Sequence, residues 1–397
     1  MSMDQLKCDN TENIYRLSIV CSSATNVTFY ECFKTYGSTI DLVRVIAGTW
    51  MLLIGILGVL GNFTILTTVP YAVKHKRHDL HKNFSSSTVF ILNLSVIELC
   101  HCLFFVLPQG LLYFNEGSIF GDRGCMIIMS ICVLTVTSDM LAMALIATSR
   151  CLHISLKEKW NQFCDMKRNI TFLILLSWFP GILSLPFLVA VKLHGTVHSG
   201  WDCRYGACGF IQSVEYDFNN NKTKDDDKMV YRELWTIMYF YTIAIPLFSI
   251  LTMFVSYLLI WYKVHKSRKY LSGNESMVQT LSEREVKMTK AISILMFCSF
   301  LCWLPLPVLN LVFLTFENSE NFDTSNDFTS SGYILYVIIQ SVFVSQYALN
   351  FFIYISRSEQ FRDAFFDGIP LLRRKYTPKI QHNIPSKNES KQKHERI

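Results

Sequence analysis

Residues 45–73 read VIAGTWMLLIGILGVLGNFTILTTVPYAV and contain no Asp, Glu, Lys or Arg. A run of this length is sufficient for an α-helix to cross the roughly 30 Å hydrocarbon core of a membrane. Because lipid offers the backbone no hydrogen-bond partners, a spanning segment must satisfy its own polar groups, and a helix does so. This stretch therefore predicts a transmembrane helix near the beginning of the chain.

Six further runs of comparable length follow the first. Acidic residues interrupt only two of them, at Glu98 in the second run and at Asp139 in the third. The alternative is a large soluble protein with buried core helices, but seven such runs in one chain argue against it. The sequence predicts an all-α membrane protein, a seven-transmembrane helix bundle within residues 42–356. The runs are residues 45–73, 84–115, 124–149, 169–191, 234–262, 291–316 and 328–356.

The composition supports this fold class. Hydrophobic residues make up 51% of the 397 residues and charged residues only 17%, whereas soluble domains carry about 25% charged residues. These values exclude a disordered chain, a collagen, a coiled coil and a small disulfide scaffold. The spans also lack the His-Glu-x-x-His, Gly-x-Ser-x-Gly and Gly-x-Gly-Asp signatures of membrane enzymes. We therefore expect the lipid bilayer as a partner, no nucleic acid and no enzymatic activity.

The charges outside the spans are sorted by side. Segments 71–83, 150–168, 261–290 and 355–397 hold 26 Lys and Arg against 11 Asp and Glu. Segments 1–41, 114–123, 192–233 and 317–327 hold 10 Lys and Arg against 18 Asp and Glu. Because cytoplasmic loops carry an excess of Lys and Arg, this asymmetry predicts the orientation of a multi-pass membrane protein. Its N-terminus is expected outside the cell and its C-terminus in the cytoplasm.

The segments outside the bundle have different expected roles. Residues 1–41 are expected to form an extracellular tail, and residues 368–397 a disordered, basic cytoplasmic tail. Between them and the last span, residues 357–367 place Phe361 and Phe365 four positions apart, which predicts a short amphipathic helix on the membrane surface. Asn26 and Asn221 are sequons on the predicted outer side, so we expect both to be glycosylated.

Six cysteines fall on the predicted outer side, where an oxidising environment allows up to three disulfides. Their connectivity is not fixed by the sequence alone. The six are Cys8, Cys21, Cys32, Cys125, Cys203 and Cys208.

Short motifs occur in order along the seven runs. They are Gly61 and Asn62, then Asn93, Leu94, Glu98 and Leu99, then Ser-Arg-Cys at 149–151, then Trp178, Pro246, Cys-Trp-Leu-Pro at 302–305, and finally Asn350 and Tyr354. In order and spacing these motifs resemble the rhodopsin-like (class A) family of G-protein-coupled receptors, over about residues 42–367. Weaker similarities connect the chain to melatonin-like and invertebrate orphan receptors.

The resemblance implies a receptor of the plasma membrane that binds an extracellular ligand and signals to a heterotrimeric G protein. A non-coupling seven-helix receptor remains an alternative, because Ser149 and Cys151 flank Arg150 where the family carries an acid and a Tyr, and Phe351 stands where it carries a Pro. A transporter is a further alternative. If the receptor does couple, we expect raised signalling without ligand, because the acid before Arg150 is missing. The positions that match the family's coupling and activation residues are Arg150, Glu285, Trp303, Pro305, Asn350 and Tyr354.

The resemblance also implies two contacts. Glu285, at the foot of the sixth span, stands where it would pair with Arg150, although the nearby Lys287 or water would compete. The family's outer disulfide would join Cys125 to a cysteine of the second outer loop. We prefer Cys208 as its partner, with Cys203 as the alternative.

Two acids lie inside the membrane, where charged residues are costly and often functional. By resemblance, Glu98 and Asp139 would form an ion pocket with Gln346 and Asn350. Two adjacent carboxylates do not both ionise readily without a cation. Either a sodium ion lies between Glu98 and Asp139, or one acid keeps its proton and no ion binds. We expect no other cofactor and no other metal.

The resemblance also argues against two ligand classes. Cys132 stands seven residues after Cys125, where amine receptors carry an Asp, and residues 328–356 contain no Lys for a retinal Schiff base. A largely apolar pocket with scattered polar groups would suit a lipid-like ligand, a small neutral ligand or the tip of a peptide. Its expected residues are Gln109, Tyr113, Cys132, Trp235, Tyr239, Asn310, Tyr336 and Gln340.

Overall fold

The computed structural model describes residues 38–75, 86–115, 119–193, 197–202, 207–212, 216–217, 222–223, 243–271, 293–294, 297–309, 330–357, 362 and 365. Within these ranges, six helices are long and apolar enough to cross a membrane. A shorter apolar helix, Phe297–Leu309, lies inside the predicted sixth run. The prediction of an all-α, seven-helix membrane bundle is confirmed. The six long spans are Leu42–Pro70, Thr88–Phe114, Arg123–Ser155, Lys167–Leu185, Ile245–Lys263 and Ile334–Ile353.

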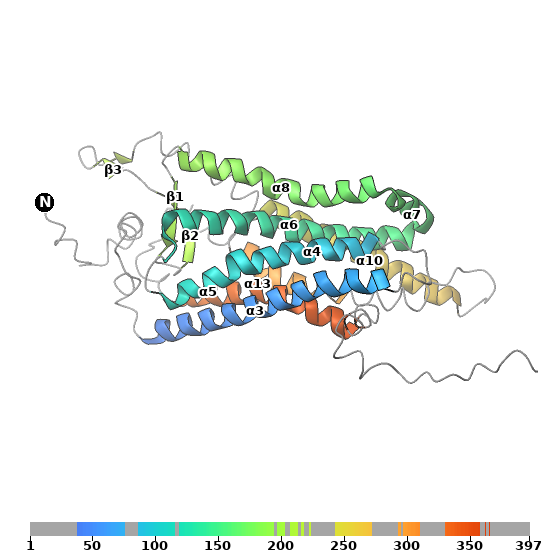
Figure 1. Ribbon diagram of the computed structural model, residues 1–397, viewed down its shortest axis with the longest axis horizontal. Coiled ribbons are helices and arrows are strands. Elements are labelled where there is room, and N and C mark those ends of the chain that lie inside the picture. Colours follow the sequence, from blue (N-terminus) through green and yellow to red (C-terminus); the bar gives the residue numbers. More distant parts are fainter. Residues whose placement is uncertain are drawn as a thin grey trace, which may run out of the picture.

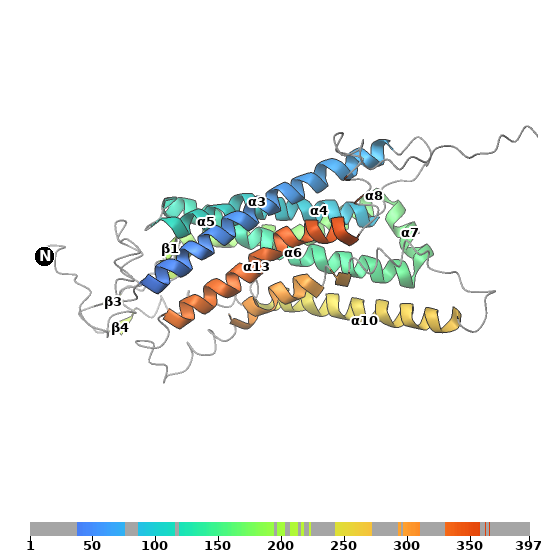
Figure 2. The ribbon, with the colours of Figure 1, turned by 90° about the horizontal axis from the view of Figure 1, so that it is seen from below.

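The helices pack side by side around α6 (Gly121–Ser155). This helix contacts α4 (Ser86–His101), α8 (Lys167–Leu193) and α10 (Ile245–Leu271). Helix α3 (Ser38–His75) packs against α13 (Ser330–Arg357), as Figure 2 shows. The long helices run in a common direction, with a β-hairpin at one end of the bundle and the short helix α7 (Lys157–Asp165) at the other (Figure 1). We call these the hairpin end and the α7 end.

Several helices extend beyond the charge-free runs that predicted them. Helix α3 begins at Ser38, before the expected boundary at residue 42, and α13 ends at Arg357. Helix α6 includes Arg123 at its beginning and continues to Ser155, past Arg150. A helix does not end where the hydrocarbon ends, so charged residues in its outer turns reach the interface. Of the proposed membrane-surface helix, only Arg362 and Phe365 are described.

The second span is not a uniform α-helix. Between α4 and α5 (Leu107–Phe114) lies the π-helical turn η4 (Cys102–Val106). It ends just before Pro108, which has no N–H and does not continue the regular hydrogen-bond pattern. π-turns of this kind concentrate at functional sites. With this extra residue in the turn, Glu98 before it and Gln109 and Tyr113 after it are all buried in the bundle.

The segment after α8 contains structure that the sequence analysis treated as loop. Strands β1 (Val197–Asp202) and β2 (Ala207–Gln212) form an antiparallel hairpin in which Trp201 pairs with Cys208. Both strands contact α6. A second, two-residue pair, β3 (Tyr216–Asp217) with β4 (Lys222–Thr223), follows.

The bundle exposes apolar side chains and buries polar ones. Phe63, Phe172 and Phe248 are each more than half exposed, whereas Glu98, Asp139 and several amide and hydroxyl side chains are buried. A soluble protein rarely shows large exposed apolar surfaces. This inverted pattern is that of a protein whose outer surface faces lipid.

Glycines set the distance between α3 and its neighbours. A Cβ atom at Gly58 would lie 2.5 Å from the Sγ atom of Cys102 and 3.3 Å from the carbonyl oxygen of Tyr347. A Cβ atom at Gly55 would lie 2.6 Å from Leu107. The absence of side chains at these positions therefore lets α3 pack directly against η4, α5 and α13.

Candidate functional site

The centre of the bundle contains a hydrogen bond between α4 and α13. The Asn350 side-chain amide donates to the Oε1 atom of Glu98. The amide nitrogen of Asn350 faces the carboxyl group of Glu98, whose oxygen accepts this hydrogen bond. Both side chains are almost completely buried, and the contact joins the second and seventh spans.

A second hydrogen bond joins α13 to α6. The Nε2 atom of Gln346 donates to the Oδ2 atom of Asp139 at 3.1 Å. Gln346 lies four residues before Asn350, so both side chains project from the same face of α13. The four residues of the expected ion pocket therefore form two hydrogen-bonded pairs that share α13.

A third contact, which the sequence analysis did not predict, joins α4 to α6. The Nδ1 atom of His101 lies 2.7 Å from the Oγ1 atom of Thr135. The Thr135 hydroxyl donates its single proton to the carbonyl oxygen of Ile131 at 2.6 Å, so Thr135 accepts from His101 and Nδ1 carries the proton. The signal was available, because His101 follows Glu98 by three residues and shares its helix face.

These three contacts form a closed arrangement, which we call the polar cluster. It comprises Glu98, His101, Thr135, Asp139, Gln346 and Asn350, and it connects each pair among α4, α6 and α13. Asn62 on α3 adds a fourth helix, because its Nδ2 atom donates to the backbone oxygen of Tyr347 at 3.3 Å.

Several buried polar atoms in and beside the polar cluster have no hydrogen-bond partner among the described residues. The acceptors among them are Asn62 Oδ1, His101 Nε2, Asp139 Oδ1, Gln346 Oε1 and Asn350 Oδ1. The indole Nε1 of Trp303 can donate, as can the hydroxyls of Ser138 and Tyr347. A buried polar atom costs free energy unless a cation, a proton, a neighbouring donor or ordered water satisfies it.

An aromatic stack links the cluster to the sixth span. His101 stacks on Tyr347 with ring centroids 4.2 Å apart. Tyr347 meets Phe343 edge-on at 5.8 Å, and Phe343 meets Trp303 edge-on at 4.6 Å. Trp303 is buried on the helix Phe297–Leu309, two residues before Pro305. A change in the position of Trp303 would therefore reach His101 through two side chains of α13.

The activation residues at the α7 end are only partly described. Arg150 is buried on α6 between Ser149 and Cys151, which are also buried. Tyr354 lies on α13. Glu285 lies outside the described residues, so its pairing with Arg150 stays a prediction. The Nζ atom of Lys263 on α10 lies 3.4 Å from the carbonyl oxygen of Ser155.

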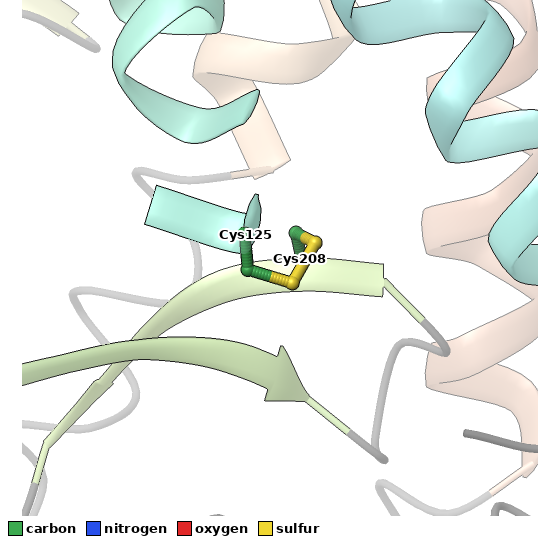
Figure 3. Close-up of a disulfide and its surroundings, with 2 residues drawn as sticks. All are labelled: Cys125 and Cys208. Atoms are coloured by element: carbon green, nitrogen blue, oxygen red, sulfur yellow. A yellow bond between two sulfur atoms is a disulfide. The ribbon is translucent and has the colours of Figure 1, made fainter. Parts of the chain in front are cut away.

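A disulfide fixes the hairpin end. Cys125 at the beginning of α6 is bonded to Cys208 on β2, with Cα atoms 5.1 Å apart (Figure 3). It is the pairing preferred from the resemblance, and it holds the hairpin against α6. The other expected outer-side cysteines, Cys8, Cys21, Cys32 and Cys203, and the sequons Asn26 and Asn221 lie outside the described residues.

The expected ligand residues come from several helices. Gln109 and Tyr113 are buried on α5, Cys132 is half-buried on α6, and Tyr336 and Gln340 lie on α13. Tyr113, Cys132 and Tyr336 belong to one hydrophobic core. Trp235, Tyr239 and Asn310 are not among the described residues, so the completeness of this pocket stays a prediction.

Comparisons with known proteins agree with this geometry. The family model of the 7 transmembrane receptor (rhodopsin family) matches residues 61–354. A similar protein is "Protein trapped in endoderm-1" of Drosophila melanogaster, which is 22% identical over 354 residues, covering 84% of this chain and 79% of the relative. The matched range begins at Gly61 and ends at Tyr354, so it includes the complete polar cluster.

Proposed function

This chain belongs to the rhodopsin family of seven-transmembrane receptors, and from that premise we propose that it couples an extracellular ligand to a heterotrimeric G protein. The observation that carries the proposal is the polar cluster, which ties α4, α6 and α13 together at the centre of the bundle. Trp303 contacts the same helix α13 through Phe343. A ligand that moves Trp303 would therefore bias how these helices pack.

The proposed mechanism is a shift between two arrangements of the bundle. Ligand bound near the hairpin end favours the arrangement in which Trp303 and Phe343 repack. This repacking alters the hydrogen bonds that α13 makes with Glu98 and Asp139. It also opens the α7 end of the bundle beside Arg150. Glu285 would restrain Arg150 in the resting arrangement through a charge-assisted hydrogen bond.

We place a sodium ion between Glu98 and Asp139 as part of this proposal. The Oδ1 atom of Asp139 supports it, since this buried carboxyl oxygen has no hydrogen-bond partner among the described residues and a cation would satisfy it. Gln346 and Asn350 would complete the shell. The alternative is a proton on one of the two acids.

The proposed orientation has two supports. Lys and Arg are concentrated in the segments of the α7 end, which favours the cytoplasm there. The disulfide at the hairpin end favours an oxidising, extracellular environment on the opposite side. The ligand pocket would then open between the outer halves of α5, α6 and α13. Its apolar character with scattered amides suits a lipid-like or small neutral ligand, or a peptide tip.

The test is ligand-independent G-protein activation in cells, measured with a panel of G-protein biosensors. The native chain is compared with Arg150→Ala, and with Arg123→Ala as a matched control at the other end of the same helix. A basal signal that Arg150→Ala abolishes and Arg123→Ala retains would support coupling and identify the pathway.

A second candidate is a receptor of this family that does not couple. Ser149, Cys151 and Phe351 favour it, because each replaces a residue that the family uses at the G-protein side. If all three proteins reach the cell surface, no channel responds and a ligand screen also fails, the non-coupling receptor is the better description.

A further inference from the structure

The π-turn η4 changes which residues of the second span face the interior of the bundle. Cys102 lies against α3, because a Cβ atom at Gly58 would be 2.5 Å from its Sγ atom. Leu107 also lies against α3, because a Cβ atom at Gly55 would be 2.6 Å from its side chain. The spacing of five residues between these two contacts, instead of three or four, is that of a π-turn. Every residue after the turn is therefore displaced by one position around the helix.

This displacement places Gln109 on the face of the second span that carries His101. Gly110 faces α3, since a Cβ atom there would lie 3.0 Å from the Leu52 side chain. Gln109 therefore precedes an α3-facing residue by one position, as His101 precedes Cys102. Because His101 contacts α6 and α13, the Gln109 side chain also projects toward the interior. It is only 2% exposed, and it lies two turns nearer the hairpin end than His101.

Gln340 has a corresponding position on α13. It lies three residues before Phe343 and seven before Tyr347, so these three side chains share one face of the helix. Tyr347 stacks on His101, so this face looks into the bundle. Gln340 is buried on it, one turn nearer the hairpin end than Phe343.

Helix α3 shows that the two glutamines lie at a similar depth. Gly110 packs beside Leu52, and the Nε1 atom of Trp50 donates to the backbone oxygen of Ser341 at 3.1 Å. Each glutamine stands immediately before one of these contacts with α3. Since Trp50 and Leu52 are two residues apart, the contacts are separated by about 3 Å along the helix. Both amides therefore lie on the hairpin side of the aromatic stack that joins the sixth span to the polar cluster.

The carbonyl group of the Gln109 amide is buried without a hydrogen bond. Its Oε1 atom has no partner among the residues that the structure describes. By contrast, the Gln346 and Asn350 amides on α13 each donate to a buried acid. A buried polar group without a partner costs free energy, and a bound molecule that supplies the missing donor removes this cost. The Gln109 amide therefore indicates a ligand.

The charges of the bundle favour a neutral ligand. Among the described residues, the buried Asp, Glu, Lys and Arg side chains are Glu98, Asp139 and Arg150. The two acids belong to the polar cluster and Arg150 lies toward the α7 end, so none of them is beside the two glutamines. An amide side chain presents a donor and an acceptor together. A ligand carboxylate only accepts and an ammonium only donates, whereas a carboxamide matches both groups.

We propose that Gln109 and Gln340 bind the carboxamide group of a neutral ligand between α5 and α13. The apolar remainder of the ligand lies against Tyr113 and Tyr336, which belong to one hydrophobic core. The inference rests on the proposed function in one respect only, which is that the chain has a ligand. It does not require coupling to a G protein.

The first test measures thermal unfolding of the purified full chain without ligand. Gln109→Leu removes an amide whose carbonyl has no partner, so the Tm should stay the same or rise. Gln346→Leu is the control, because it removes the hydrogen bond to Asp139 and should lower the Tm. If Gln109→Leu lowers the Tm as much as Gln346→Leu does, the Gln109 amide is a structural group and the proposal is wrong.

The second test compares three probes that share one ring, benzamide, benzoate and benzylammonium. Their binding to the full chain in nanodiscs is measured by saturation-transfer NMR. The native chain should bind benzamide in preference to both charged probes, and so should Glu158→Gln, which changes an exposed residue of α7. Gln109→Leu and Gln340→Leu should each weaken benzamide binding about tenfold, as expected for the loss of two ordinary hydrogen bonds.

Two outcomes of the probe experiment would overturn the proposal. One is equal benzamide binding, at any level, by the native chain and Gln109→Leu. The other is binding of benzoate or benzylammonium that matches or exceeds binding of benzamide. Neither test contains a G protein, so a chain that binds benzamide through Gln109 but activates no biosensor would refute coupling and still support this inference.

Discussion

Gln346 on α13 donates a hydrogen bond of 3.1 Å to Asp139 on α6, across 207 positions of sequence. One turn further along α13, Asn350 makes the corresponding contact with Glu98 on α4. The seventh span thus carries two amide side chains on one face, and each donates a hydrogen bond to an acid on a different helix. Any change in the charge of either acid alters how three helices are held together.

The first prediction concerns the proposed ion. In the native chain, sodium is expected to raise the Tm relative to an equal concentration of choline, because an ion that binds only the folded state stabilises it by about 2.7 kcal/mol at a hundredfold excess over Kd. Asp139→Asn keeps an acceptor for Gln346 but removes the charge, so the sodium effect should disappear. Thermal unfolding of the purified chain in detergent measures this.

Glu158→Gln is the control for that experiment, since it removes an exposed acid of α7 that lies outside the polar cluster. It should keep the full response to sodium. A native chain that shows no difference between sodium and choline would instead favour the alternative in which one acid keeps its proton.

The second prediction concerns the His101–Thr135 contact. Thr135→Val preserves shape but leaves the Nδ1–H group of His101 without its acceptor in a buried site, which should cost about 1–3 kcal/mol of stability. Adding His101→Phe removes both polar partners and should recover part of this loss. A double-mutant cycle by thermal unfolding measures the coupling.

Thr64→Val is the matched control, because Thr64 also donates to a carbonyl four residues earlier, at 2.6 Å from Leu60, but has no histidine partner. It should change stability by less than Thr135→Val does. Additive effects of His101→Phe and Thr135→Val would contradict the pairing.

The third prediction concerns helix packing. Gly58→Ala places a methyl group 2.5 Å from the buried Cys102 Sγ atom, and such overpacking typically costs about 1–3 kcal/mol. Cys102→Ala removes the obstructing atom, so the double variant should be more stable than Gly58→Ala alone. Thermal unfolding and surface expression report both. If Cys102→Ala gives no relief, the distance between α3 and η4 is set by something other than this contact.

The fold was largely predictable because hydrocarbon imposes a simple rule on sequence. A segment without charges and long enough to span must be a helix, and this rule located all seven runs. The ends of the helices did not follow from it, as Ser38 and Arg357 illustrate, because helices continue into the interface. The π-turn at residues 102–106 was missed because apolar runs and charges do not distinguish a π-turn from a regular α-helix.

The site was predictable where family motifs covered it and missed where they did not. Glu98, Asp139, Gln346 and Asn350 were expected together, and the structure pairs Gln346 with Asp139 and Asn350 with Glu98. The ion that they would bind stays a prediction. His101 was overlooked although its spacing from Glu98 places both on one face. Helix α7 and the β1–β2 hairpin were overlooked because the sequence analysis searched for apolar runs, and neither element is one.

The fourth prediction concerns the absent acid beside Arg150. Ser149 is buried, and its Oγ atom has no hydrogen-bond partner within the described ranges. Ser149→Asp would place a carboxylate next to the guanidinium, and a charge-assisted hydrogen bond between them favours the resting arrangement. Basal signalling should therefore fall in the biosensor channel that responds to the native chain. Ser149→Asn introduces a side chain of nearly the same size as Asp but neutral, so it should lower the basal signal less.

Equal basal signals from the native chain and Ser149→Asp, at matched surface expression, would mean that Arg150 is already restrained at rest by another group. Glu285 is the candidate for that role, and Glu285→Gln should then raise the basal signal.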